Sequence, residues 1–309
     1  VPDTGAMNAF AAGFPFSETD DQLNAIEDTL ADLAAGRPMD RLICGDVGFG
    51  KTEVALRAAF AVAMEGFQVA LLVPTTLLAR QHFMNFSARF ANTPVRVAQL
   101  SRLVGASDQQ AIKTQLEAGE VDIVIGTHAL LASGLRFKRL GLLVLDEEQR
   151  FGVKQKEQIK ALRASLHVLT LTATPIPRTL QLSLTGVKDM SLIATQPIDR
   201  LAVRSFVMPW DGVMIREALM REHFRGGQSF VVCPRVRDLA ELQERIEALT
   251  PELKLGVAHG QLNSTQLEKV MDAFLSRQFD VLISTNIIET GIDIATANTL
   301  VVHRADRFG

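Results

Sequence analysis

The chain has 309 residues, of which 47% are hydrophobic and 22% are charged, and its formal net charge is −3. This length and composition allow two domains with large apolar cores. A net charge so close to zero excludes a generally basic nucleic-acid-binding surface, so any such contact must come from local patches. Lys154, Lys156 and Lys160 form one candidate patch, although they could equally be the solvated face of a helix.

Features of secreted and membrane proteins are not found in this sequence. No apolar run approaches the roughly 20 residues that span a bilayer. The N-terminus lacks the charged-then-apolar plan of a signal peptide. The two cysteines, Cys44 and Cys233, lie in apolar runs and are predicted to be buried free thiols in a reducing compartment. We therefore expect a soluble, cytoplasmic protein.

The first half of the chain alternates apolar runs with amphipathic stretches. Residues 1–40 predict a loosely ordered lead-in and then a helix that Asp20 or Asp21 can cap. The apolar runs that follow lie at 42–44, 69–73, 95–100, 122–125, 142–145 and 168–172. Continuous apolar runs separated by helical periods are typical of buried parallel strands in a doubly wound α/β domain.

The second half repeats this pattern after a break. Between residues 191 and 204 the helical signal lapses, so we place the domain boundary there, with domains at 1–195 and 196–309. Helices are predicted at 213–224, 239–249 and 264–275, and strands at 229–233, 253–258, 281–284 and 299–302. The fold class is therefore α/β, with two doubly wound parallel-sheet domains.

A glycine-rich segment links the run at 42–44 to the next helix. It reads Gly-Asp-Val-Gly-Phe-Gly-Lys-Thr, and the residues predicted to cradle a nucleoside triphosphate are Gly45, Val47, Gly48, Phe49, Gly50, Lys51 and Thr52. Glycines let backbone N–H groups wrap phosphates, and the helix N-terminus adds the positive end of its dipole. Lys51 is predicted to reach the β- and γ-phosphates, and the Thr52 hydroxyl to ligate Mg²⁺. The alternative is a glycine-rich turn that binds nothing.

Three acidic residues and a glutamine follow the run at 142–145. They read Asp146-Glu147-Glu148-Gln149. Carboxylates at the end of a buried strand are costly unless something compensates their charge. Beside a phosphate-binding loop, Asp146 can hold the Mg²⁺ shell, and Glu147 can orient and deprotonate the attacking water. The alternative is an ordinary acidic turn at the surface.

Three motifs together resemble the superfamily-two helicases and translocases. They are the phosphate loop, the segment Asp-Glu-Glu-Gln-Arg-Phe-Gly-Val-Lys that begins at Asp146, and the segment Leu-Thr-Leu-Thr-Ala-Thr-Pro-Ile-Pro-Arg-Thr-Leu at 169–180. Within that superfamily, Phe49 and residues 171–180 and 287–293 favour the transcription-repair coupling factors, with the branch-migrating RecG helicases next. The resemblance extends over about 14–309.

The resemblance implies two RecA-like domains with ATP and Mg²⁺ in the cleft between them. The implied activity is ATP-driven translocation on double-stranded DNA. In a full-length parent protein, RNA polymerase and excision-repair proteins would bind through regions outside this chain. A RecG-like enzyme would instead remodel DNA forks. A kinase or GTPase with a phosphate loop is disfavoured, because the second half carries the helicase-like segments His259-Gly260 and Thr290-Gly291.

The resemblance also implies roles for further residues. Adenine recognition is implied for Phe16 and Gln22, although Phe16 could simply staple the helix that follows. Nucleotide contacts across the cleft are implied for Glu289, Gly291 and Asp293, and coupling of the two sites for residues 172–174. DNA contacts are implied for Thr75, Thr76, Arg80, Gly126, Thr127 and His128 in domain 1, and for His259, Gly260, Ser284 and Thr285 in domain 2.

Alternatives and departures accompany these assignments. Thr75 and Thr76 could equally cap a helix. His128 and His259 are too far from other Cys or His residues for a structural metal site. Gln149 stands where many relatives have His, and an amide can still hydrogen-bond but carries no charge.

The chain also stops before the Gln…Gly-Arg-x-Gly-Arg motif that supplies arginine fingers, so we expect the second domain to be truncated. Arginine fingers contribute roughly 10³–10⁵ in rate. This chain could therefore be a nucleotide-binding fragment with little turnover.

Overall fold

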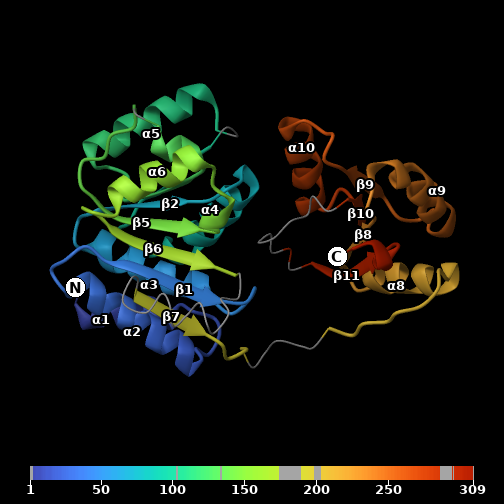
Figure 1. The fold of residues 1–309 in the computed structure, drawn as a ribbon, viewed down its shortest axis with the longest axis horizontal. Helices are drawn as coiled ribbons and strands as arrows, with labels where there is room; N and C mark the ends of the chain where they lie inside the picture. The colour runs from blue at the N-terminus through green and yellow to red at the C-terminus, as the bar shows by residue number, and fades with distance from the viewer. Residues whose placement is uncertain are drawn as a thin grey trace. The chain divides into compact units, whose positions relative to one another are not determined.

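The computed structural model describes residues 3–101, 104–132, 134–173, 189–197, 203–285, 294 and 296–308. The chain divides into two compact units, Val1–Leu201 and Ala202–Gly309, which are described separately (Figure 1). Each is built around a parallel sheet, which confirms the predicted α/β fold class. We placed the domain boundary at 195/196 from the sequence.

Unit 1 is built on a sheet of seven strands within its described residues, in the order β3-β4-β2-β5-β6-β1-β7. The strands are β1 Asp40–Gly45, β2 Gln68–Leu72, β3 Val97–Leu100, β4 Ile123–Gly126, β5 Leu140–Asp146, β6 His167–Thr172 and β7 Asp189–Ile193. Neighbouring strands all pair in parallel, so their carboxyl ends lie along one edge of the sheet (Figure 1).

Helices cover both faces of this sheet, which explains why its strands read as continuous apolar runs. The helices are α1 Thr4–Ala12, α2 Asp20–Ala34, α3 Lys51–Met64, α4 Thr76–Phe90, α5 Ala106–Ala118 and α6 Val153–Leu162. On one face, Leu116 of α5 and Ile159 of α6 join a core with Leu72 and Leu143 of the strands. Helix α3 packs against β1, β2, β5 and β6, and Val54, Ala58 and Ala59 on it are fully buried.

The N-terminal segment is more ordered than the sequence predicted. We expected a loosely ordered lead-in, but residues 4–12 form α1. Phe10 of this helix is buried, and its ring stacks on Phe60 with centroids 4.2 Å apart. The Arg89 guanidinium lies 4.4 Å from the centroid of the same ring. These partners come from α3 and α4, so local sequence could not reveal them.

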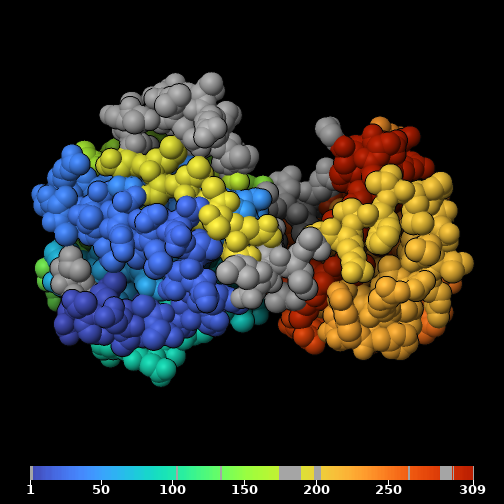
Figure 2. Space-filling model, turned by 90° about the horizontal axis from the view of Figure 1, so that it is seen from below, coloured from blue at the N-terminus to red at the C-terminus, as the bar shows by residue number. Residues whose placement is uncertain are grey.

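Two further expectations need correction. Helix α2 is capped by Thr19 rather than by Asp20 or Asp21, because Thr19 and Gln22 form a reciprocal capping box. The irregular stretch expected after residue 191 also overlaps β7, which pairs with β1 and packs against α2. Figure 2 shows β7 in yellow beside the blue N-terminal residues on one face of unit 1.

Unit 2 has a sheet of four parallel strands within its described residues, in the order β11-β8-β10-β9. Its elements are α8 Gly212–Phe224, β8 Gln228–Val232, α9 Leu239–Leu249, β9 Leu255–Ala258, α10 Ser264–Leu275, β10 Val281–Ser284 and β11 Ala297–Val302. Leu219 of α8 and Ile246 of α9 join one core with Val231. Phe274 of α10 packs against Phe230, with ring centroids 5.1 Å apart.

Both cysteines are buried free thiols, as predicted. Burial raises the pKa of Cys44 to about 11 and raises that of Cys233 as well. Among the residues that the structure describes, no helix has the length and apolar character needed to cross a membrane.

Candidate functional site

The loop between β1 and α3 has the backbone geometry of a phosphate cradle. Gly48 and Gly50 adopt left-handed conformations, with φ of 79° and 77°, which favour glycine. A Cβ on Gly50 would also lie 2.3 Å from the side-chain nitrogen of Gln22. Gly50 is the N-cap of α3, and no side chain in the described structure caps this helix end. The first-turn N–H groups and the positive end of the dipole therefore suit an anionic ligand.

Lys51 lies across this loop. Its Nζ donates hydrogen bonds to the backbone oxygens of Gly45, at 2.7 Å, and Asp46, at 2.8 Å. Burial lowers the pKa of Lys51, and the negative charges of Asp146 and Glu147 partly offset that effect. The ammonium group is thus held beside two carboxylates that the sequence places almost a hundred positions away.

Glu147 follows β5 in a strained and tightly held conformation. Its φ of 53° is left-handed, which costs a non-glycine residue roughly 1–3 kcal/mol and persists only where the surroundings enforce it. Its side chain accepts hydrogen bonds from the Ala173 N–H, at 3.0 Å, and from the Gln149 amide. Glu147 is 7% exposed. Two donors therefore orient this carboxylate at the carboxyl ends of β5 and β6.

The residues present fit a magnesium ion held jointly with a nucleotide. The Asp146 carboxylate and the Thr52 hydroxyl are oxygen donors of the kind that Mg²⁺ prefers. In the described ranges, no group of three or more His, Cys, Asp or Glu side chains could hold a metal by itself. Mg²⁺ often binds through one or two carboxylates plus substrate phosphates. The donor set therefore suits Mg²⁺ bound together with a triphosphate.

Gln22 lies beneath the phosphate loop. Its amide nitrogen donates to the Phe49 carbonyl at 2.9 Å, and its amide oxygen accepts from the Thr19 N–H at 2.9 Å. The Gln22 side chain is 2% exposed, and its hydrogen bond to Phe49 supports the loop on its buried side. Phe16 is 58% exposed, and its ring meets Phe14 edge-on. Adenine recognition by Phe16 and Gln22 stays a prediction.

The predicted DNA contacts of unit 1 follow the neighbouring strands β2 and β4. Thr75 caps α4, because its hydroxyl accepts the Leu78 N–H at 3.2 Å, and Thr76 is buried in the first turn. Gly126 ends β4, and a Cβ there would lie 2.3 Å from the Leu100 carbonyl oxygen. Thr127 is buried and His128 is exposed. The capping alternative therefore holds for Thr75, and a capping hydroxyl can still donate a hydrogen bond.

The predicted DNA contacts of unit 2 also meet at strand ends. His259 directly follows β9. The neighbouring strand β10 ends at Ser284, and Thr285 directly follows it. Ser284 is fully buried, and its Oγ has no hydrogen-bond partner among the described residues; the same is true of His259 Nδ1. Gly260 is exposed. Thr174, Glu289, Thr290, Gly291 and Asp293 lie outside the described residues.

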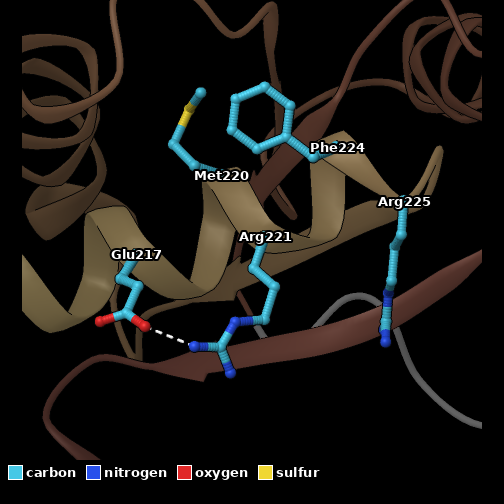
Figure 3. Close-up of a pocket in the computed structure, with 5 residues that line it drawn as sticks. All are labelled: Glu217, Met220, Arg221, Phe224 and Arg225. Carbon is cyan, nitrogen blue, oxygen red and sulfur yellow. Dashed lines mark hydrogen bonds and ion pairs between the residues drawn. The ribbon is translucent and has the colours of Figure 1, made fainter.

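A shallow pocket on α8 is separate from all of these predictions. It is lined by Glu217, Met220, Arg221, Phe224 and Arg225 (Figure 3). None of the residues predicted for nucleotide or DNA binding lines it.

Comparison with known families agrees with this arrangement. The DEAD/DEAH box helicase family matches residues 19–183, and the helicase conserved C-terminal domain matches residues 213–307. The chain belongs to the DEAD/DEAH box helicase family. The second matched range contains the four-stranded sheet of unit 2. The first contains strands β1 to β6 of unit 1, but not β7, together with the phosphate loop and Glu147.

Curated relatives refine this membership. The chain is 56% identical over 300 residues to the transcription-repair-coupling factor of Myxococcus xanthus, covering 97% of this chain and 25% of that protein. It is 53% identical over 307 residues to that of Escherichia coli K12, covering 99% and 27%. The chain thus spans about a quarter of these relatives. The resemblance to transcription-repair coupling factors inferred from the motifs is confirmed.

A solved helicase structure has the same fold. A structure of RecG bound to a three-way DNA junction is 35% identical, with a TM-score of 0.83 over 99% of this chain and 41% of that one. The helicase fold implies nucleotide binding, which the loop at residues 45–52 suits.

The sequence did not reveal every residue that shapes this helicase-family site. His82 of α4 hydrogen-bonds to Asp146, and the Ala173 N–H holds Glu147. Glu53, directly after Thr52, is buried and accepts hydrogen bonds from Arg57 and Arg89. A polar residue at an inward position of an amphipathic helix was the one signal that could have singled out His82.

Proposed function

We propose that this chain is the ATP-dependent double-stranded-DNA translocase motor of a transcription-repair coupling factor. In this proposal the motor acts on stalled RNA polymerase and couples transcription to DNA repair. Polymerase and excision-repair proteins would bind through parts of the relatives outside the matched quarter. The identity of 53–56% to proteins of that name supports the choice.

The observation that carries the enzymatic part is that Lys51, Asp146 and Glu147 lie at the same edge of the sheet. Strands β5, β6 and β1 are consecutive in the sheet, so the acidic turn and the phosphate loop share one edge. The negative charges of Asp146 and Glu147 raise the pKa of Lys51 and so partly offset the effect of burial. A lysine and two carboxylates beside an uncapped helix are the parts that phosphoryl transfer requires.

Each of these side chains has one proposed task. Lys51 exchanges its two carbonyl partners for β- and γ-phosphate oxygens. Thr52 and Asp146 would hold Mg²⁺, which when bound would neutralise charge on the phosphoryl oxygens. Glu147, oriented by the Ala173 N–H, accepts a proton from the attacking water. Gln149 keeps the Glu147 carboxylate in place through its amide.

The DNA-binding part of the proposal uses the same edge of the sheet. In the order β4-β2-β5-β6-β1, the predicted DNA segments follow the first two strands. The acidic segment follows β5, the predicted coupling segment starts at the end of β6, and the phosphate loop follows β1. Backbone amides, hydroxyls and an arginine suit phosphate contacts, which hold DNA without reading its sequence. In unit 2, unpartnered polar atoms of His259 and Ser284 support the same role.

Steady-state ATPase activity with and without duplex DNA tests this proposal. We expect DNA to stimulate turnover, and the stimulation to weaken from low to moderate salt as phosphate contacts are screened. ATP binding without stimulation would favour a nucleotide-binding fragment. Lys51→Ala should weaken ATP binding roughly 10–100-fold, because it removes charge-assisted hydrogen bonds of about 1.5–3 kcal/mol. Unchanged ATP affinity in this variant would contradict the assignment of Lys51.

A second candidate is fork remodelling of the RecG type. The observation that favours it is the TM-score of 0.83 to RecG bound to a three-way junction. Stimulation of the ATPase by a three-way junction well above that by linear duplex would support this candidate. Equal stimulation, together with displacement of a stalled polymerase by a full-length protein, would support the coupling factor.

A further inference from the structure

His82 makes a contact that none of the motifs accounts for. It lies on α4 and is 8% exposed. Its Nε2 is 2.9 Å from Oδ2 of Asp146, which lies 64 positions later in the chain. Its ring meets Phe86 edge-on, with centroids 6.3 Å apart, and Phe86 is fully buried. Packing therefore holds the imidazole in place while one nitrogen faces the carboxylate.

The direction of this hydrogen bond follows from chemistry. An ionised carboxylate only accepts hydrogen bonds, so Nε2 of His82 carries the hydrogen and donates. The Asp146 side chain is only 15% exposed, which limits what water can offer it in place of that donor. A fixed donor on one carboxylate oxygen removes rotational freedom from the side chain.

We propose that His82 is a positioning residue that sets the orientation in which Asp146 meets the Mg²⁺ of a bound nucleotide. The proposal rests on the function proposed above. Groups that hydrogen-bond to metal-binding carboxylates orient them, and losing such a group typically costs 10–100-fold in metal affinity or activity. His82 acts through Asp146 and does not itself contact the nucleotide.

A packing role alone makes a different prediction. A buried histidine can be kept simply because it fills space against Phe86 and satisfies its own nitrogen. In that case any side chain of similar volume would preserve the site. Leucine and glutamine have similar volumes, and only glutamine can donate a hydrogen bond to Asp146. Comparing these two substitutions therefore separates positioning from packing.

Binding of a non-hydrolysable fluorescent ATP analogue tests the proposal without relying on turnover. Affinity is measured with and without Mg²⁺ for the wild type, His82→Leu and His82→Gln. We expect all three to bind equally without Mg²⁺. We expect Mg²⁺ to increase the affinity for the analogue in the wild type and in His82→Gln. This Mg²⁺ gain, the ratio of the affinities with and without Mg²⁺, should be about 10-fold smaller in His82→Leu.

A second histidine provides a matched control. His223 of α8 is paired with Asp280 in unit 2, with Nδ1 and Oδ1 3.1 Å apart. His223→Leu removes the same type of pair at a position that is predicted to bind neither nucleotide nor DNA, so it should leave the Mg²⁺ gain unchanged. Thermal unfolding of every variant checks the fold. If His82→Leu does not fold, His82→Met takes its place as the substitution that fills space without a donor.

The outcomes distinguish failure of the role proposed for His82 from failure of the proposed ATP-dependent function. A full Mg²⁺ gain in the variant without a donor would overturn the role of His82. So would an equal loss in His82→Leu and His82→Gln, because that result indicates packing. A wild-type protein that binds no nucleotide in either condition would overturn the proposed function itself.

Discussion

The two units share one architecture but differ at the carboxyl ends of their strands. In unit 1 this edge carries Lys51, Asp146 and Glu147, and protein groups hold each of them. In unit 2 the same edge carries Ser284 and His259, each with a buried polar atom that has no partner among the described residues. Side chains held in one orientation by the protein are suited to catalysis. Buried polar atoms that lack a partner within the protein are suited to hydrogen-bonding a ligand.

Two ion pairs, one in each unit, differ in burial. Glu53 of unit 1 is buried between Arg57 and Arg89, with distances of 2.7 and 2.8 Å. Glu217 and Arg221 of unit 2 form a pair on the exposed surface of α8 (Figure 3). Buried charges are costly unless they are paired, while exposed pairs contribute little. The buried Glu53 pairs should therefore matter more to stability than the exposed pair of Glu217 and Arg221.

The largest expected effect concerns the oriented carboxylate of unit 1. Glu147→Gln keeps the shape of the side chain but cannot accept a proton from water. We expect turnover to fall roughly 10²–10⁴-fold, the usual contribution of a general base. ATP affinity should stay within about 2-fold, because the phosphate loop is unchanged. Single-turnover hydrolysis and equilibrium binding measure the two quantities. Near-normal turnover would show that another group takes the proton.

The next effect concerns the buried ion pairs. Glu53→Gln leaves two arginines beside a neutral side chain, so the free energy of unfolding should fall by about 3 kcal/mol. Glu217→Gln is the matched control on the surface, and its effect should stay below about 0.5 kcal/mol. Urea unfolding of both variants measures these changes. Similar values for the two variants would remove the contrast between the buried pairs of Glu53 and the exposed pair of Glu217.

A smaller effect is expected at the unpartnered hydroxyl of unit 2. Ser284→Ala removes a buried polar atom that has no partner, so stability should be unchanged or rise by up to about 1 kcal/mol. Duplex affinity should fall by up to about 10-fold if this hydroxyl contacts DNA. Thr250→Val is the control, because its buried hydroxyl donates to the Ile246 carbonyl at 2.8 Å and its loss should cost about 1 kcal/mol.

If Ser284→Ala costs as much stability as Thr250→Val, the Ser284 hydroxyl has a partner within the protein. That result would remove the observation that supports DNA contact at this strand end.

The smallest effect is a dependence of stability on pH. Burial lowers the pKa of His167, whose Nδ1 accepts the Met39 N–H at 3.1 Å. The folded state therefore favours the neutral imidazole. This stabilisation is complete above the unfolded pKa, near 6.5, and is lost as pH falls through the lower folded pKa. His167→Gln should flatten the fall in melting temperature between about pH 7.5 and pH 5.

His303 provides the same test in unit 2. Burial lowers its pKa, and the nearby Arg304 and Arg245 add to that effect. His303→Gln should therefore flatten the same part of the profile. Curves unchanged from the wild type in both variants would contradict neutral, buried imidazoles at these two positions.

Local sequence predicted much of this molecule. Residues 239–249, 264–275 and 281–284 form the predicted elements with the same bounds. The phosphate loop was visible because its glycines, Lys51 and Thr52 lie within eight consecutive residues. Helix periods, apolar runs and loop motifs involve residues close together in the sequence, so they can be recognised without knowledge of the fold.

Contacts between distant segments had no such signal. Helix α1 depends on the rings of Phe60 and Phe90, and β7 depends on pairing with β1. The bracing of the phosphate loop by Gln22 joins residues 27 positions apart. A single sequence read locally contains no record of which strands become neighbours, and such packing can override local propensity.

The sequence by itself predicted the nature of the chemistry: a loop for phosphates, a carboxylate for a metal and a carboxylate for water. Only the tertiary structure decided how these groups are held. His82 reaches Asp146 because α4 packs against the sheet to which β5 belongs. The Ala173 N–H reaches Glu147 because β6 pairs with β5. Residue types set what a group can do, whereas strand order and packing set which groups meet.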